Sequence, residues 1–383
     1  MLVLVHPYGL KSPGGGSRIF RTILSESNQS WISVCSSSQK PPSSDLGEEV
    51  HYPLRSSFGR IETSRLGKYL YFFEQRGRGR FEQKLLDMCQ ERGATAIHGV
   101  AHALDFWYAY RVAQRLGLPY YLTIHDDLQY ALKGRPELNE GMSHLPEVWE
   151  KSTHRFVISQ VMGEEYCRRY GDQPYSIVTD GISQLEVAPL PRPKKSFRLY
   201  FMGAVHLSYE RNFRSLHGAL QLLKIDHPDW DISLTIRGGC PFQFENTHVP
   251  VNFLPWASEA EVGRDLEQAD YLYLPLPLDP EFESFVKFSL STKMVTYLGS
   301  GLPIVYHGPK QAAASELLSD AQAAIICNSS QEIDIKTTLS QAPFIREEII
   351  NHALQLGKDS FTVDQVRRSF WSYIGKEKHL CPL

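Results

Sequence analysis

The chain has 383 residues, more than one hydrophobic core usually organises, so the sequence predicts two domains of ordinary size. Its 40 Lys and Arg against 43 Asp and Glu leave a formal net charge of -3, which gives no general case for nucleic-acid binding. The six cysteines are scattered without a CxxC pair, which argues against a disulfide framework or a zinc site and predicts reduced thiols in a cytoplasmic protein.

The N-terminal segment MLVLVHPYG is apolar over too few residues for a signal-peptide core, and no basic stretch precedes it. No segment approaches the ~20 consecutive apolar residues of a membrane-spanning helix. We therefore expect a first buried strand here and a chain that does not span a membrane, with association at the inner membrane face left open.

Short apolar runs alternate with helical segments along the whole chain, which predicts parallel strands covered by crossover helices. In the first half we expect strands at residues 2–6, 31–35, 95–98, 120–124, 155–159 and 176–178. The proline-rich stretch 188–196 (APLPRPKKS) suits neither a helix nor a central strand and is the predicted linker. The pattern then restarts, with strands expected at 197–202, 231–236, 251–254, 271–274, 303–306 and 323–327.

The predicted fold is therefore α/β, with a first Rossmann-like domain at 1–187 and a second at 197–359. In the tail 360–383, Phe361, Val366, Phe370 and Tyr373 have spacings compatible with one helical face. This segment is either an ordinary last helix or one that crosses back to the first domain.

The first expected strand runs directly into the glycine-rich segment SPGGGSR, residues 12–18. Glycines allow backbone N–H groups to approach an anion at the start of a helix. The spacing matches neither a dinucleotide fingerprint nor a P-loop, and a plain flexible turn explains the segment equally well.

Three histidines accompany the strands near residues 95–98 and 120–124. His98 and His102 have the i, i+4 spacing of metal ligands but lack an evident third ligand, so a strand-end and a helix-start residue are the preferred interpretation. His125 closes a buried strand at its carboxyl end, where ligands bind in parallel sheets, and is either a substrate contact or a structural histidine. We interpret Asp126 and Asp127 as an N-cap and a solvated turn, not a metal pair.

The segment 270–308 is the most informative. A buried strand ends in a proline-broken loop, and Ser291, Thr292 and Lys293 then open a helix. Hydroxyls, free amides and a cation at a helix start are what a diphosphate requires. The alternative is ordinary capping by Ser291 or Thr292 without a ligand.

Together these segments resemble the retaining glycosyltransferases of the GT-B fold, specifically the family 4 group that uses nucleotide diphosphate sugars. The resemblance covers nearly the whole chain. The matching segments are Pro13-Gly14-Gly15-Gly16, His125, Ser159 with Glu164 or Glu165 further on, Asp180-Gly181, Gly203, Tyr209-Glu210-Arg211-Asn212, Arg237-Gly238-Gly239 and the block from Lys293 to Pro303.

The resemblance implies two Rossmann-like domains whose parallel sheets face across a cleft that holds the donor. It assigns catalytic roles to His125, which contacts the sugar, and to Arg211 and Lys293, which stabilise the leaving diphosphate. The implied donor-binding residues are Gly15, Gly16, Gly203, Asn212, Arg237, Ser291, Thr292 and Thr296.

Two departures from the family pattern stand out. Ala204 occupies a position that is commonly basic, which leaves Arg211 as the nearby cation. Of the paired glutamates of the family, the first falls near Phe288 and the second on Thr296, so that a hydroxyl replaces the carboxylate that usually contacts the donor ribose.

The predicted function is transfer of a sugar from a nucleotide diphosphate sugar to a hydroxyl of a glycan or lipid-linked acceptor, in polysaccharide or glycoconjugate biosynthesis. We expect retention of configuration, with the leaving phosphate taking the acceptor proton, and neither a metal nor a cofactor. A catalytically silent GT-B partner protein, suggested by Ala204 and Thr296, and a nucleotide-sugar epimerase remain alternatives.

Residues 54–84 carry eight basic side chains against three acidic ones, with aromatic residues interleaved. This composition suits a peripheral contact with an anionic membrane beside a lipid-linked acceptor. A solvated helix pair with a mobile loop at residues 76–80 is the alternative.

Overall fold

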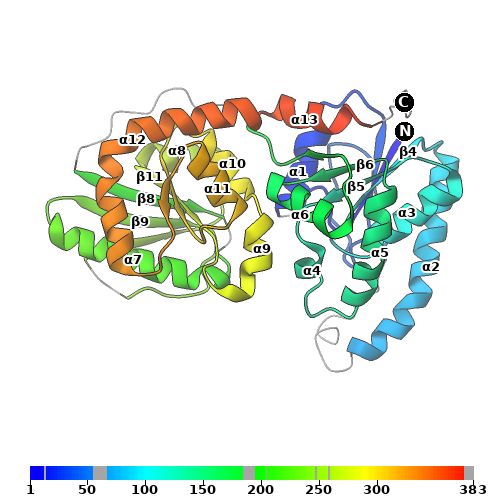
Figure 1. Cartoon of the computed structure of the whole chain (residues 1–383), viewed down its shortest axis with the longest axis horizontal. Coiled ribbons are helices and arrows are strands. Elements are labelled where there is room, and N and C mark those ends of the chain that lie inside the picture. The colour runs from blue at the N-terminus through cyan, green and yellow to red at the C-terminus, as the bar shows by residue number, and fades with distance from the viewer. Residues whose placement is uncertain are drawn as a thin grey trace. The chain divides into compact units, whose positions relative to one another are not determined.

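The computed structural model describes residues 1–12, 14–54, 67–183, 195–203, 205–245, 248–257 and 259–374, with backbone alone for 67–76, 259 and 260. The chain divides into two compact units (Figure 1). Unit 1 comprises Met1–Asp180 together with the chain from Val363 onward, and unit 2 is Gly181–Thr362. The expected linker 188–196 falls almost wholly outside the described residues, and its last residue, Ser196, begins a strand.

Unit 1 is built on a seven-stranded parallel sheet in the order β3-β2-β1-β4-β5-β6-β7. The strands are β1 (Leu2–His6), β2 (Trp31–Cys35), β3 (Glu49–His51), β4 (Ala96–Val100), β5 (Tyr120–Ile124), β6 (His154–Val157) and β7 (Tyr175–Ile177). β1, β4 and β5 are buried along their whole length, as expected of central strands covered on both faces. Since all the strands are parallel, their carboxyl ends share one edge.

The helices of unit 1 are α1 (Gly15–Leu24), α2 (Gly67–Glu91), α3 (Asp105–Leu116), α4 (Leu128–Ala131), α5 (Leu138–Lys151), α6 (Gln160–Tyr170) and α13 (Val363–Trp371). α13 packs on α1: Arg367 donates a hydrogen bond to the Thr22 carbonyl, and the Trp371 indole donates one to the Ile23 carbonyl. This helix, the last one among the described residues, therefore belongs to unit 1.

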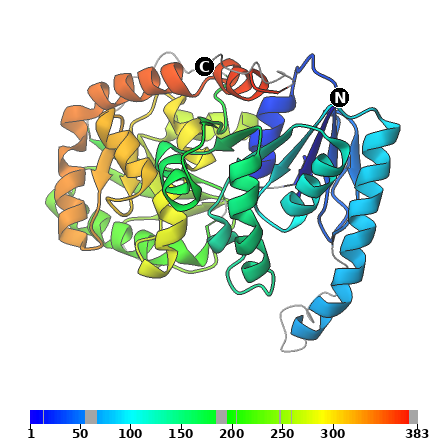
Figure 2. The same ribbon diagram turned by 45° about the vertical axis from the view of Figure 1, so that its right-hand side comes forward.

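Unit 2 repeats the plan with a six-stranded parallel sheet in the order β10-β9-β8-β11-β12-β13. The strands are β8 (Ser196–Met202), β9 (Asp231–Arg237), β10 (Val251–Leu254), β11 (Tyr271–Pro275), β12 (Ile304–His307) and β13 (Ile325–Cys327). Its helices are α7 (Glu210–Asp226), α8 (Glu259–Gln268), α9 (Glu283–Phe288), α10 (Thr292–Leu298), α11 (Ala313–Asp320) and α12 (Glu332–Ser360), with short 3-10 turns at Leu207–Tyr209 and Pro280–Phe282. The long α12 packs against α7 and β13 (Figures 1 and 2).

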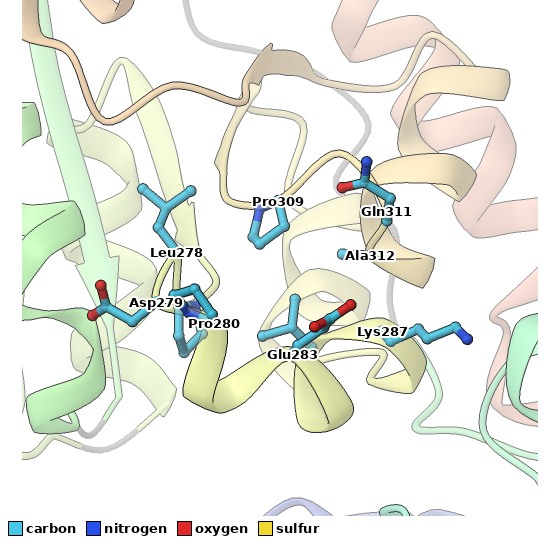
Figure 3. Close-up of a pocket in the computed structure, with 10 residues that line it drawn as sticks. Leu278, Asp279, Pro280, Glu283, Lys287, Pro309, Gln311 and Ala312 are labelled. Carbon is cyan, nitrogen blue, oxygen red and sulfur yellow. The ribbon is translucent and has the colours of Figure 1, made fainter.

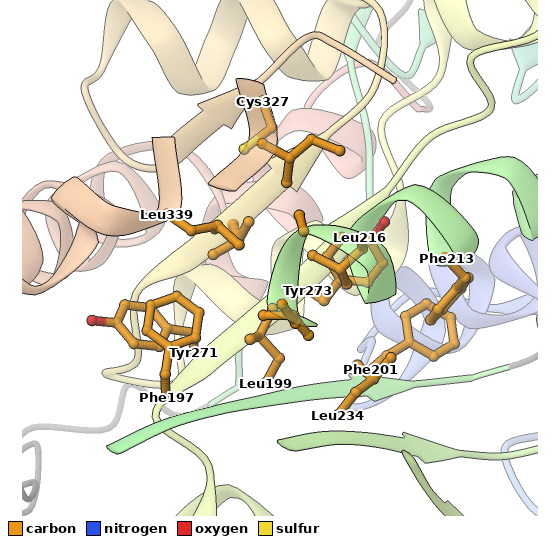
Figure 4. Packing of buried hydrophobic residues seen from close by; sticks show 14 of the residues in the cluster. Phe197, Leu199, Phe201, Phe213, Leu216, Leu234, Tyr271, Tyr273, Cys327 and Leu339 are labelled. Carbon is orange, nitrogen blue, oxygen red and sulfur yellow. The ribbon is translucent and has the colours of Figure 1, made fainter. Parts of the chain in front are cut away.

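One core of unit 2 lies between its sheet and the pair α7 and α12 (Figure 4). Phe197 of β8 stacks on Tyr271 of β11, with ring centroids 4.3 Å apart. Phe201 meets Phe213 of α7 edge to face at 5.2 Å. Burying each such side chain stabilises the fold by roughly 1.5–3 kcal/mol relative to its exposure, so these aromatic contacts hold the strand ends of unit 2 firmly in place.

The prediction of an α/β chain with two Rossmann-like domains is confirmed. Every expected strand is present, with ends shifted by no more than two residues. The sequence missed β3, a three-residue edge strand that is only half buried and has no apolar run. Of the tail residues placed on one helical face, Val366 and Phe370 are buried in α13, whereas Phe361 precedes the helix and joins a core of unit 2.

Glycines 203 and 238 meet at the ends of β8 and β9, and their packing gives a stability prediction. Gly238 has φ +118°, and a Cβ there would lie 2.5 Å from the Gly203 carbonyl oxygen, whereas a Cβ on Gly239 would meet nothing within 4 Å. We expect Gly238→Ala to lower the free energy of unfolding by about 1–3 kcal/mol, and Gly239→Ala to change it by less than about 0.5 kcal/mol. Thermal unfolding followed by circular dichroism checks this, and equal midpoints for the two variants would contradict it.

Candidate functional site

The carboxyl edge of the unit 2 sheet gathers several predicted site residues. Gly203 follows β8 in a left-handed conformation (φ +112°), and its N–H donates to the Arg237 carbonyl at the end of β9. α10 is anchored beside them because the Tyr297 hydroxyl accepts a hydrogen bond from the Met202 N–H. Lys293 lies one turn before Tyr297 on the same helix face, so its side chain is directed at the end of β8.

The Lys293 ammonium occupies a narrow, largely aromatic setting. Its Nζ lies 5.5 Å from the ring centroid of Phe201 and 6.0 Å from that of Tyr209. A Cβ on Gly203 would come within 3.0 Å of Lys293 Cε, so glycine leaves the room that this side chain uses. Within the described ranges, no carboxylate lies at ion-pair distance from the Lys293 ammonium.

Burial lowers the pKa of Lys293 from 10.5 to about 8. The ammonium is therefore mostly protonated at neutral pH while it has lost part of its hydration. A part-buried cation without a counter-ion is stabilised by any anion that reaches it, and a phosphate oxygen would form a charge-assisted hydrogen bond there.

The start of α10 combines capping with groups that remain accessible. Ser291 is the N-cap and accepts a hydrogen bond from the Lys293 N–H, as the capping alternative requires. Thr292 is the first helical residue, and the Thr296 hydroxyl donates to its carbonyl at 3.2 Å. Ser291, Thr292 and Thr296 are all partly exposed, so a ligand can still reach them in the capped helix.

Two predicted donor contacts, Asn212 and Arg237, have hydrogen-bond partners within unit 2. Asn212 is fully buried, and its amide donates to the carbonyls of Leu276 and His307, which ties together the chain beyond β11 and the end of β12. Arg237 forms a bidentate ion pair with Asp265 and donates to the Pro255 carbonyl. Both residues shape the edge of the sheet from within.

Arg211 is half exposed at the start of α7. Its guanidinium donates to Asp279 and to the Ser330 hydroxyl, each at 2.9 Å. Its charge is thus partly neutralised by Asp279, unlike that of Lys293. Ala204, the departure expected to weaken this region, lies outside the described residues.

Asp279 also lines a hollow of about 430 Å³ beyond the ends of β11 and β12 (Figure 3). Its polar lining comes from Asp279, Glu283, Lys287 and Gln311, and its apolar lining from prolines and the side chains of Leu278, Val286 and Ala312. This mixed lining suits a polyhydroxylated group, because the carboxylates and the amide can bond hydroxyls while the apolar side chains cover carbon.

At the carboxyl edge of the unit 1 sheet, His125 meets a partner that the sequence analysis missed. The Tyr8 hydroxyl and His125 Nδ1 share a 2.6 Å hydrogen bond, and a Cβ on Gly16 would lie 2.4 Å from the Tyr8 oxygen. Gly15 and Gly16 form the first turn of α1, which has no acidic residue at its start. Tyr8 lies two residues beyond β1, and this strand-end position was the signal that could have identified it.

His102 and Asp126 form a second pair at this edge, with His102 Nδ1 3.4 Å from the carboxylate. Asp127 is the N-cap residue of α4, as expected, but it does not lie in a solvated turn. It is buried, accepts a hydrogen bond from Tyr166, and pairs with Arg169 at 3.2 Å. Throughout the part of the chain that the structure describes, no group of three or more His, Cys, Asp or Glu side chains could hold a metal ion.

The basic segment 54–84 is described only in part. Residues 55–66 lie outside the described residues, and 76–80 belong to helix α2 and not to a loop. Arg78 is buried and paired with Glu140 at 2.7 Å, whereas Arg80 and Lys84 are exposed. Among the described helices, none has the length and apolar character needed to cross a bilayer.

No protein-family model and no curated protein sequence matches the chain. Solved structures match its fold over nearly the full length. A sucrose-phosphate synthase from Thermosynechococcus elongatus gives a TM-score of 0.69 at 11% identity, covering 97% of both chains. HepE of Anabaena, in complex with UDP and glucose, gives 0.69 at 12% identity, covering 98% of this chain and 99% of its own.

The trehalose-6-phosphate synthase OtsA gives a TM-score of 0.62 at 12% identity, covering 97% of this chain and 98% of its own. These proteins are GT-B glycosyltransferases, and the agreement extends through both units. The fold of this chain is therefore GT-B, as the sequence predicts.

The pKa of Lys293 gives a pH prediction for binding of a nucleotide diphosphate, with UDP as the probe. The ammonium is charged below pH 8 and neutral above it, while the charge of UDP changes little above neutrality. At pH 9 only about a tenth of Lys293 is charged, so the Kd for UDP should rise about tenfold between pH 7 and pH 9.

Isothermal titration calorimetry checks this pH dependence. Lys293→Arg stays charged throughout this range and serves as the matched control, for which we expect a nearly constant Kd. Equal pH dependence in the two proteins would show that Lys293 does not bind the diphosphate.

Proposed function

We propose that this chain transfers a sugar from a nucleotide diphosphate sugar to an acceptor hydroxyl. The observation that carries the proposal is the part-buried Lys293 ammonium, which faces Gly203 at the carboxyl edge of unit 2 without a counter-ion in the described part of the chain. The GT-B fold supports it, because one of the matching structures is a complex with UDP and glucose and another a complex with UDP-glucose.

In this proposal the diphosphate of the donor lies against Lys293. Ser291 and Thr292 directly precede Lys293 in the sequence. Their hydroxyls add neutral hydrogen bonds to the diphosphate at the start of α10. Arg211 contributes by exchanging part of its pairing with Asp279 for a phosphate oxygen. The hollow beyond β11 and β12 accommodates the sugar, since its carboxylates and amide match hydroxyl groups.

The departing diphosphate gains negative charge as the bond to the sugar breaks. Cations and hydrogen-bond donors fixed in advance around this group bind the transition state more tightly than the ground state, which lowers the barrier. We assign this work to Lys293 and Arg211, so that the reaction requires neither a metal ion nor a cofactor.

We further propose that transfer proceeds with retention, as in the family 4 enzymes that the sequence resembles. The acceptor oxygen forms its bond to the anomeric carbon on the face from which the diphosphate leaves, and the acceptor proton passes to the departing phosphate oxygen. Proton NMR of the first-formed product distinguishes the outcomes, because an inverted anomer would rule out this route.

The acceptor we propose is a glycan or a lipid-linked glycan. Arg80 and Lys84 on α2 are available for a peripheral contact with an anionic membrane, which provides roughly 1 kcal/mol per basic residue near the surface. Sedimentation with phosphatidylserine vesicles should therefore carry down the wild type more than an Arg80→Gln/Lys84→Gln variant. Equal sedimentation of the two would remove this part of the proposal.

A thermal-shift panel of UDP, GDP, ADP and their sugar conjugates tests donor binding. A ligand at 100 times its Kd stabilises the folded state by about 2.7 kcal/mol, so at least one nucleotide should raise the unfolding midpoint of the wild type. Lys293→Met should lose most of that rise. Lys358→Met, at an exposed lysine on α12, is the matched control and should keep it.

Release of nucleotide from the best-binding donor then tests turnover. We expect wild type to turn over and His125→Ala to be at least tenfold slower, a loss of about 1.4 kcal/mol of transition-state stabilisation. If the donor binds but neither protein turns it over, the chain is a catalytically silent GT-B partner. An isomerised nucleotide sugar as the product would instead identify an epimerase.

A further inference from the structure

A tyrosine and a histidine form the same hydrogen-bonded pair in both units. In unit 1 the Tyr8 hydroxyl meets His125 Nδ1 at 2.6 Å, and in unit 2 the Tyr273 hydroxyl meets His307 Nδ1 at 2.8 Å. Both histidines lie at or just beyond the carboxyl end of a buried strand, β5 in the first case and β12 in the second.

The two pairs differ at the other ring nitrogen. His307 Nε2 lies 2.8 Å from the Ser329 carbonyl, which can only accept, so His307 carries its proton on Nε2 and its Nδ1 accepts from Tyr273. His125 Nε2 is shielded from solvent and has no hydrogen-bond partner among the described residues. Unit 2 therefore supplies within the protein an acceptor that has no counterpart among the described residues of unit 1.

The chemistry of the unit 1 pair favours the same proton arrangement. A phenol is a stronger acid than a neutral imidazole N–H, and an imidazole nitrogen is the better acceptor, so the hydroxyl donates. No other acceptor for the Tyr8 hydroxyl occurs in the described ranges. Burial lowers the pKa of His125 to about 3 and raises that of Tyr8 well above 10, so both groups are neutral under ordinary conditions.

Gly16 is part of the same arrangement. Any Cβ at this position would lie 2.4 Å from the Tyr8 oxygen and 2.5 Å from Cζ, so only glycine lets α1 begin over the tyrosine without displacing it. The rings of Tyr8 and His125 are also nearly parallel, with an interplanar angle of 19° and centroids 6.2 Å apart. The hydroxyl is thus held by packing on one side and by the histidine on the other.

We infer that Tyr8 is a positioning residue that fixes the tautomer of His125, so that its Nε2–H serves as a hydrogen-bond donor to an oxygen of the bound sugar. This inference rests on the proposed function and defines the role of His125 within it. The histidine donates a hydrogen bond and does not act as a base. The ligand that we propose is an oxygen acceptor, either a sugar hydroxyl or the ring oxygen. It lies against His125 Nε2 as the Ser329 carbonyl lies against His307 Nε2.

Histidine-selective 15N NMR of the full chain at pH 7 tests the tautomer without any substrate. His125 of the wild type, assigned by the signal lost in His125→Gln, should show a bare Nδ1 and a protonated Nε2. Tyr8→Phe should give a mixture of tautomers at His125. Tyr273→Phe is the matched control and should leave His307 unchanged, because the Ser329 carbonyl still holds its Nε2 proton.

A wild-type His125 protonated on Nδ1 would overturn the inference even if Tyr8→Phe failed to fold. So would a Tyr8→Phe protein in which His125 keeps the wild-type tautomer. With the donor from the turnover assay, Tyr8→Phe should lower kcat by about three- to tenfold and leave the Kd of the free nucleotide diphosphate unchanged. Should no donor be turned over, the proposed function fails, while the NMR result still decides the role of Tyr8.

Discussion

A cation that has lost part of its hydration is stabilised by an anion, and Lys293 is such a cation. Lys293 has aromatic rings on two sides and glycine beneath its stem, and burial has already lowered its pKa to about 8. A partly buried lysine with a purely structural role would pair with a carboxylate, as Lys336 does with Asp226. A diphosphate satisfies the requirement, and the parallel sheet brings the necessary hydroxyls to the same edge.

Around this cation, several residues hold the edge of the sheet in shape through contacts within unit 2. Asn212 ties the chain beyond β11 to β12, Arg237 holds the end of β9 to Asp265 on α8, and Gly238 packs its backbone against Gly203. In unit 1, Gly16 has a comparable role, because its lack of a side chain leaves space for Tyr8. Glycines and polar residues that look like ligand contacts in a sequence thus often serve the backbone that carries the contacts.

The sequence predicted the strands well because buried parallel strands are short, continuous apolar runs between helical segments, and both sheets follow that pattern. It missed β3, which is short and half buried, and it placed Asp127 in solvent, because a buried ion pair with Arg169 joins residues 42 positions apart and has no local signal. The position of Lys293 at a helix start was visible from Ser291 and Thr292. The Tyr8–His125 pair was not visible in the sequence, because only the folded sheet brings the ends of β1 and β5 together.

Acylation of the lysines by an amine-reactive reagent, with and without UDP, tests directly whether Lys293 binds the diphosphate. Peptide mass spectrometry gives the extent of reaction at each lysine. A lowered pKa leaves more neutral amine at pH 7.5, so Lys293 should acylate readily in the free protein and be protected when UDP is bound, while the exposed Lys358 reacts equally in both. Labelling of Lys293 that saturating UDP leaves unchanged would contradict the account.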